Sequence, residues 1–100
     1  KQDTKLVSYE MFSNGMSIED IVNERGLTRI TIESHLIDCL EKGMDLDLEK
    51  YVHTEYKDKI MKAIEDIGTD KLKPIKEALP EEISYFDIRY YVAMHKLNKT

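Results

Sequence analysis

Apolar residues recur at spacings of three and four along most of the chain, which is the period of an amphipathic α-helix. No segment shows the sustained alternation of apolar and polar residues that marks a half-buried β-strand. The first apolar run lies between Thr4, which can cap a helix, and Asn14-Gly15, a pair that favours the left-handed turn ending one. The pattern therefore predicts an all-α chain.

The clearest pattern follows this first helix. Ser17 and Asp20 stand in a near capping-box relation at the start of a short helix, and Gly26 can supply the positive φ that stops it. Thr28 then caps a longer helix, which we expect to end at Gly43. Two helices joined by a turn of about three residues form a helix-turn-helix. The apolar residues expected to fix the longer helix across the shorter one are Leu27, Ile32 and Leu36.

The second half repeats this style. Thr54 is a candidate cap for a helix that Gly68 ends. A short helix up to Leu79 must hold Pro74 in or near its first turn, because proline has no N–H to donate further along. Ser84 then caps the last helix.

The two halves also share an apolar spacing. In each, an apolar residue precedes the cap of the longer helix, and further apolar residues follow it at offsets of five and nine. We interpret this as a second helix-turn-helix unit, with a chance match as the alternative explanation. The predicted fold class is thus an all-α helical bundle with two helix-turn-helix-like units, in residues 1–43 and 44–100, packed as one domain. The matching positions are Leu27, Thr28, Ile32 and Leu36 in the first half and Ile83, Ser84, Ile88 and Val92 in the second.

Composition narrows the class of protein. One hundred residues, 41% of them hydrophobic, suffice for one small core. With Cys39 as its single cysteine, the chain cannot form a disulfide framework. The sequence contains neither a stretch of about 18 apolar residues, which a membrane span needs, nor the apolar core of a secretion signal. We therefore expect a cytoplasmic protein segment that was cut from a longer chain and has no membrane partner.

The charge constrains any contact with nucleic acid. The formal net charge is −5, whereas nonspecific binding to phosphates is driven by lysine and arginine displacing counterions. Contact with DNA would have to come from a local patch. Lysines cluster at 57–62 and 71–76, although such runs are usually solvated helix faces.

The helix that begins after Thr28 carries the first candidate site. Arg29 is the one residue there that could pair with a guanine edge, while Thr28, Thr31 and Ser34 could hydrogen-bond to phosphates near the helix N-terminus. Helix capping is the alternative role for Thr28. Glu33 works against this surface because it places a negative charge close to phosphates.

The second candidate site lies in the other half. Tyr85 and Arg89 occupy positions analogous to the reading face, and Lys73 and Lys76 lie on the preceding helix. An aromatic side chain flanked by cations could stack on unpaired bases. We expect the neighbouring aromatic residues Phe86 and Tyr90 to be core instead.

One apolar stripe is not accounted for by the first unit. Ile30 and Ile37 are seven residues apart and share a helix face, and this face is not the one that carries Ile32 and Leu36. We expect an apolar cover over both, supplied by the second half of the chain or by another protein.

Catalysis, metals and cofactors find no support in the sequence. His35 and Cys39 stand one helical turn apart, yet a closed zinc site needs four ligands. Neither a nucleophile with a base nor a glycine-rich phosphate loop is present. We therefore predict a noncatalytic segment with no metal and no cofactor.

The order of the segments SIEDI, RGL and TIESHL resembles the helix-turn-helix of LuxR-type regulators and sigma-factor region 4. Across residues 11–93, with Lys73-Pro74-Ile75 and Ile83-Ser84-Tyr85, the chain more specifically resembles the helix-turn-helix module near the C-terminus of RecQ-type and related bacterial DNA helicases. This resemblance implies a DNA-binding accessory domain that holds duplex, junction or single-stranded DNA near an ATP-driven motor domain located elsewhere. The alternatives are a protein-interaction module of the same parent protein and the DNA-binding domain of a transcription regulator.

Overall fold

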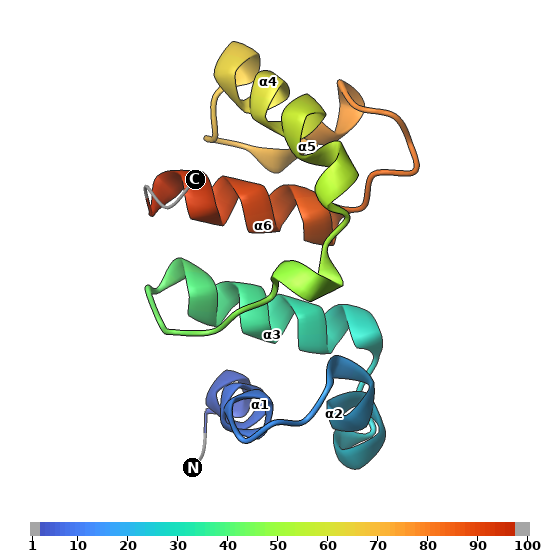
Figure 1. Ribbon diagram of the computed structural model, residues 1–100, viewed down its shortest axis with the longest axis vertical. Helices are drawn as coiled ribbons and strands as arrows, with labels where there is room; N and C mark the ends of the chain where they lie inside the picture. Colours follow the sequence, from blue (N-terminus) through green and yellow to red (C-terminus); the bar gives the residue numbers. More distant parts are fainter. Residues whose placement is uncertain (1–2, 98–100) are drawn as a thin grey trace. The chain divides into compact units, whose positions relative to one another are not determined.

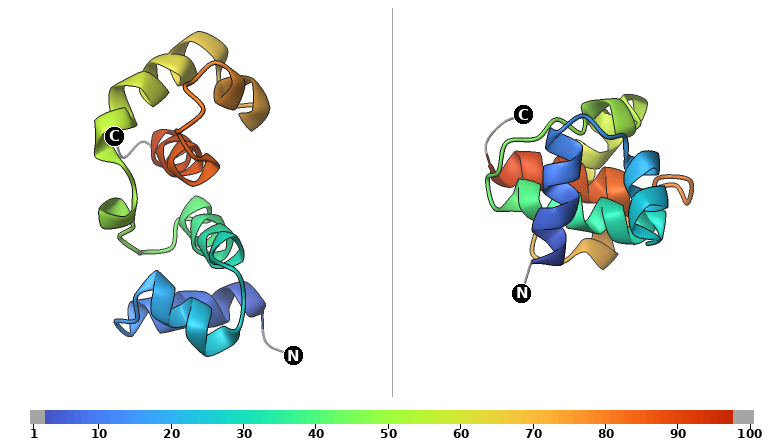
Figure 2. Two further views of the ribbon diagram at one scale, coloured as in Figure 1. Left: turned by 90° about the vertical axis from the view of Figure 1, so that its right-hand side faces the viewer. Right: turned by 90° about the horizontal axis from the view of Figure 1, so that it is seen from below.

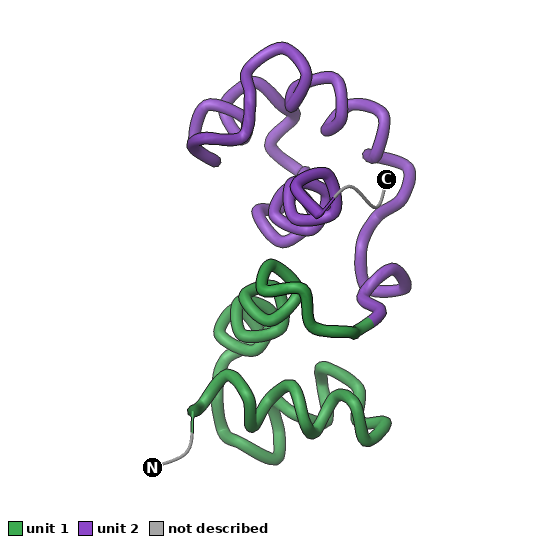
Figure 3. Tube along the Cα trace, turned by 90° about the vertical axis from the view of Figure 1, so that its left-hand side faces the viewer, with its two compact units in different colours: residues 1–46 green, residues 47–100 purple. Residues whose placement is uncertain are grey.

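The computed structural model describes residues 3–97, and this part of the chain contains six α-helices and two short 3-10 helices but no β-strand (Figure 1). The predicted all-α class is therefore confirmed. By its contacts the chain divides into two compact units, residues 1–46 and 47–100 (Figure 3). The packing of the two halves as one domain stays a prediction.

Unit 1 is built from α1 (Thr4–Ser13), α2 (Ile18–Arg25) and α3 (Arg29–Glu41), and each helix contacts the other two. Two views show α1 and α2 on the same side of α3 (Figures 1 and 2). The fully buried apolar side chains of this unit are Ile18, Ile21, Ile32, Leu36 and Ile37.

The helix starts of unit 1 follow local capping chemistry. Ser17 and Asp20 form the complete capping box of α2, with Asp20 N–H donating to Ser17 Oγ at 3.0 Å and Ser17 N–H donating to Asp20 Oδ2 at 3.2 Å. The prediction that Thr4 caps α1 is wrong by one residue. Asp3 is the cap, and its carboxylate accepts from Lys5 N–H at 2.9 Å.

Unit 2 contains η1 (Glu49–Tyr51), η2 (Thr54–Tyr56), α4 (Lys57–Ile67), α5 (Leu72–Glu77) and α6 (Tyr85–Lys96). The three α-helices contact one another pairwise, as those of unit 1 do. Its fully buried apolar side chains are Leu48, Ile60, Ile75, Ile83 and Ile88.

Two details of unit 2 differ from the sequence expectation. Thr54 opens the 3-10 turn η2 and does not cap α4, which begins after Tyr56 without a side-chain cap. The apolar spacing also predicts Ile67 on the inner face of α4 with Ile60 and Ile64, but Ile67 is 42% exposed. Pro74 is the third residue of α5, where its missing N–H leaves no hydrogen bond unmade.

The predicted equivalence of α3 and α6 holds in the local structure. Thr28 Oγ1 accepts from the N–H three residues on at 3.2 Å, and Ser84 Oγ does the same at 3.2 Å. The paired apolar positions are also buried alike, with relative exposures of 0–2%. These positions are Ile32 and Leu36 in α3 and Ile88 and Val92 in α6.

Candidate nucleic-acid interface

The turn between α2 and α3 sets the direction in which α3 begins. Gly26 has φ 65°, a left-handed conformation that residues with a Cβ rarely adopt, and its N–H donates to Val22 O at 2.9 Å. Thr28 then returns the backbone to an extended conformation, with φ −72° and ψ 158°. The first turn of α3 starts immediately after it.

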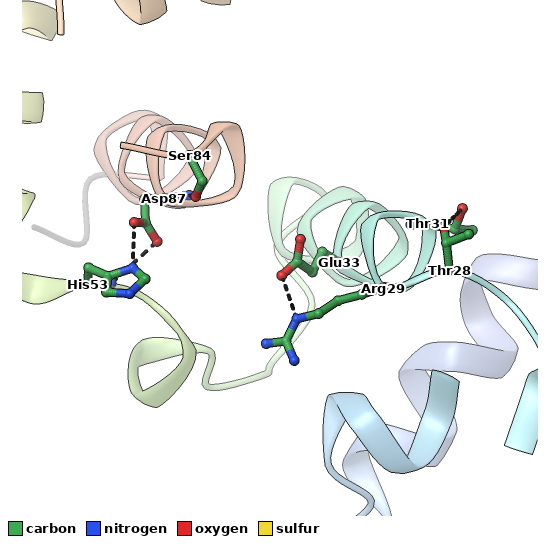
Figure 4. Close-up of polar contacts among 7 residues, drawn as sticks. All are labelled: Thr28, Arg29, Thr31, Glu33, His53, Ser84 and Asp87. Atoms are coloured by element: carbon green, nitrogen blue, oxygen red, sulfur yellow. Dashed lines mark hydrogen bonds and ion pairs between the residues drawn. The ribbon is translucent and has the colours of Figure 1, made fainter. Parts of the chain in front are cut away.

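The hydroxyls of Thr28 and Thr31 are engaged with each other (Figure 4). Thr28 Oγ1 caps α3 by accepting from Thr31 N–H, and its own O–H donates to Thr31 Oγ1 at 2.9 Å. Thr28 is exposed and Thr31 is half-buried. Thr28 therefore caps α3, as the alternative interpretation expected.

Arg29 is the first residue of α3, and its side chain is 50% exposed. Its Nε donates to Glu33 Oε2 at 3.1 Å, one helical turn further on. Figure 4 shows the two terminal nitrogens of the guanidinium directed away from Glu33. Glu33 therefore holds Arg29 in one orientation. The same carboxylate is expected from the sequence to repel phosphates.

The two isoleucines of the unexplained stripe differ in burial. Ile37 is fully buried, whereas Ile30 is 78% exposed. Ile37 therefore meets the expectation of an apolar cover, and cover of Ile30 by the second half of the chain or by another protein stays a prediction. Ser34, the remaining candidate on this helix, is half-buried.

The second candidate site brings two of its four residues together. Lys76 Nζ lies 5.8 Å from the centre of the Tyr85 ring, and it donates to Glu81 O at 3.0 Å and to Ile83 O at 2.7 Å. These hydrogen bonds of Lys76 therefore stabilise the turn between α5 and α6. Tyr85 is 47% exposed at the first position of α6.

The other two residues of that site are placed separately. Lys73 is exposed on α5, and Arg89 is half-buried one turn into α6. Phe86 and Tyr90 are buried, as expected of core residues.

One buried contact of unit 2 had no signal in the sequence. Asp87, whose side chain is 1% exposed, accepts from His53 Nδ1 at 2.9 Å and from the His53 N–H at 3.3 Å (Figure 4). The hydrogen bond and the charge of Asp87, with a smaller contribution from Glu55, raise the pKa of His53. The contact fastens the segment before η2 to the first turn of α6.

A buried polar network joins the three helices of unit 1, and it too was missed. Arg25 donates to Ser8 Oγ at 2.7 Å and to Thr4 O at 2.8 Å, while Ser8 Oγ lies 2.9 Å from His35 Nδ1. Burial, together with the charges of Arg25 and Lys5, lowers the pKa of His35. The neutral imidazole of His35 can therefore accept a hydrogen bond from the Ser8 hydroxyl through Nδ1.

The described residues contain no cluster of three or more histidine, cysteine or acidic side chains suited to hold a metal ion. Among the helices of residues 3–97, none has the length and apolar character needed to cross a membrane.

A family model described as a helix-turn-helix domain matches residues 4–92. The chain belongs to this helix-turn-helix family. Protein YpbB of Bacillus subtilis (strain 168) is similar to it, with 29% identity over 82 residues. That alignment covers 82% of this chain but only 23% of the length of YpbB. No solved structure matches the chain.

Proposed function

We propose that this helix-turn-helix chain is a noncatalytic nucleic-acid-binding domain that positions DNA near the motor of a cytoplasmic, helicase-like parent protein. The observation that carries the proposal is the first turn of α3, where the half-exposed Arg29 pairs with Glu33 and its terminal nitrogens point away from that carboxylate (Figure 4). In helix-turn-helix proteins the second helix contacts base edges with its N-terminal residues.

The chemistry of this turn suits DNA. The two terminal nitrogens of a guanidinium can donate to guanine O6 and N7. The N-terminus of α3 adds a partial positive charge that favours a phosphate. Thr28, Thr31 and Ser34 are the neighbouring hydroxyls on or beside the same turns. Because the Arg29 charge is paired with Glu33, this turn supports DNA binding through its hydrogen-bond donors and the helix N-terminus, on a chain whose net charge is −5.

Unit 2 would supply a second contact, suited to unpaired bases. The Tyr85 ring, with Lys76 beside it, can stack on a base, and the exposed Lys73 and half-buried Arg89 are the further cations proposed for phosphates. This composition favours junctions and single strands over one particular duplex sequence.

The helicase context rests on the resemblance of residues 11–93 to the accessory module of RecQ-type enzymes. The chain carries no glycine-rich phosphate loop with the Lys-Ser or Lys-Thr pair of an ATP-binding motor. The motor domain is therefore proposed as a partner elsewhere in the parent protein, and this segment as noncatalytic.

The test is a DNA-binding titration with a matched pair of variants. Arg29→Ala removes the cation at the start of α3, and Lys42→Ala removes an exposed cation at its C-terminal end. Fluorescence anisotropy with labelled duplex, forked and single-stranded DNA should show about tenfold weaker binding for Arg29→Ala, the loss expected for one bidentate base contact. Lys42→Ala should bind as the wild type does. Equal binding by all three proteins would remove the first turn of α3 as the site.

The exposure of Ile30 favours a second candidate function, docking to another protein such as the parent motor domain. An exposed isoleucine next to hydroxyls and an arginine also suits a protein interface. Ile30→Asp should then abolish docking to the motor domain in a pull-down, while circular dichroism shows an unchanged helix content. Docking that survives this variant would contradict the interaction function.

A further inference from the structure

Ile30 is the side chain of unit 1 that the fold explains least. It is the second residue of α3 and is 78% exposed, while Ile32, two residues later, is fully buried. The other large apolar side chains that are exposed reach 42–47%. Ile30 therefore contributes little to the core of the described structure.

Helix formation does not account for Ile30 either. A β-branched side chain loses rotamer freedom in a helix, so alanine, glutamate or lysine would stabilise an exposed first turn better. The start of α3 is already secured by the Thr28 cap and the Arg29–Glu33 pair. An apolar group at this position is consequently available for contact with a ligand.

The neighbours of Ile30 define what such a ligand offers. Arg29 precedes it, with terminal nitrogens directed away from Glu33, and Thr31 follows it within the capped turn (Figure 4). In the major groove, base edges present hydrogen-bonding groups and one apolar group, the 5-methyl of thymine. Because Arg29 and Ile30 are consecutive residues of α3, their side chains project about 100° apart and would meet different base edges.

Building on the proposed function, we propose that Ile30 is a specificity-determining residue that contacts thymine 5-methyl groups when α3 enters the major groove. The contact buries a methyl group against an otherwise exposed side chain. It gives the domain a preference for thymine next to the base bound by Arg29.

The experiment removes only the methyl group. Binding of the 100-residue chain is measured by anisotropy to a mixed-sequence duplex and to the same duplex with every thymine replaced by uracil. Burial of one methyl group is worth about 0.8 kcal/mol, so the wild type should bind the uracil duplex about fourfold more weakly for each thymine contacted. Ile30→Ala keeps only a short apolar side chain, so its difference in affinity between the two duplexes should be smaller than that of the wild type.

Leu6→Ala is the matched control, because Leu6 is an exposed apolar residue of unit 1 on a different helix. It should keep the preference for thymine. A wild type that binds both duplexes equally overturns the inference and leaves the proposed function standing, and so does an unchanged preference in Ile30→Ala. A wild type that binds neither duplex, fork nor single strand overturns the proposed function and the inference with it.

Discussion

Polar side chains in the interior of unit 1 form a connected set that depends on a single hydroxyl. Ser8 is fully buried, and it receives a hydrogen bond from Arg25 while contacting the imidazole of His35. Because these residues lie on α1, α2 and α3, the hydroxyl links all three helices. A buried polar group that loses its partner costs more than an ordinary hydrogen bond contributes.

Ser8→Ala should therefore destabilise the protein by about 2 kcal/mol, since it leaves Arg25 and His35 without this partner. Urea denaturation at pH 7, followed by circular dichroism, measures the free energy of unfolding. Ser13→Ala is the control, because Ser13 is exposed at the end of α1. Its effect should stay within about 0.5 kcal/mol. An equal effect of the two substitutions would show that the network is not stabilising.

His53 should make a pH-dependent contribution to stability. Its pKa is raised in the folded state by Asp87, so the folded state holds a proton at pH values where the unfolded state has lost it. The contribution is fully present below the unfolded pKa of about 6.5 and is lost as pH rises through the folded pKa. The stability difference between the wild type and His53→Ala should accordingly be larger at pH 5.5 than at pH 8.5.

Proton NMR titration of His53 provides the control for this effect. In Asp87→Asn the His53 pKa should return toward about 6.5, because the negative charge is gone while the shape remains. The His35 pKa is shifted in the opposite direction, so comparison with His53→Ala is needed to separate the two residues. A stability difference that grows with pH would contradict the assignment.

At the scale of elements, the helix starts and stops could be predicted because their chemistry is local. Ser17, Thr28 and Ser84 each cap from within three residues, and Gly26 ends α2 through its own backbone conformation. The predicted caps of α1 and α4 were wrong because two neighbouring residues can compete to begin a helix. Asp3 displaces Thr4 as a cap, and a 3-10 turn uses Thr54 before α4 can begin.

Contacts between elements were less predictable. The two partners of the Asp87–His53 pair are 34 residues apart, and those of the Ser8–His35 pair are 27 apart. Neither pair leaves a periodic signal in the sequence. At the candidate interface the residue types were evident, yet the role of Glu33 in orienting Arg29 required the side-chain geometry.

The turn between α5 and α6 depends on Lys76, one of the four residues of the second candidate site. Lys76 donates to Glu81 O and Ile83 O, so Lys76→Met, which keeps the aliphatic stem, should destabilise the fold by about 1–2 kcal/mol. Lys73→Met should change stability by less than about 0.5 kcal/mol, because Lys73 is exposed on the same helix. Thermal unfolding of the two variants compares them directly, and equal melting temperatures would contradict the proposed role of Lys76.

At the scale of the whole molecule, the two units repeat one arrangement with different surfaces. Each has three mutually contacting helices, a capped third helix and a pair of buried residues at matching positions. The corresponding first turns diverge: α3 begins with Arg29 and an exposed Ile30, whereas α6 begins with Tyr85 beside Lys76. A shared skeleton therefore carries two different exposed first turns, one with an arginine and an isoleucine and the other with a tyrosine beside a lysine.

The number of phosphates that the cations of this acidic chain neutralise sets how strongly salt should affect DNA binding. Each phosphate neutralised by a cation contributes a slope of about −0.9 to the plot of log affinity against log salt for duplex DNA. Three such contacts would weaken binding about 40-fold between 50 and 200 mM salt, which is less than a strongly basic domain would lose. Anisotropy titrations across that range measure the slope for the wild type, Arg29→Ala and Lys42→Ala.

If Arg29 contacts a phosphate, the slope of Arg29→Ala should be shallower by about one unit. If Arg29 reads only a base edge, Arg29→Ala should bind more weakly with an unchanged slope. Binding that does not change with salt would show that the acidic surface leaves no cationic contact to DNA, and the protein-docking function of Ile30 would then be favoured.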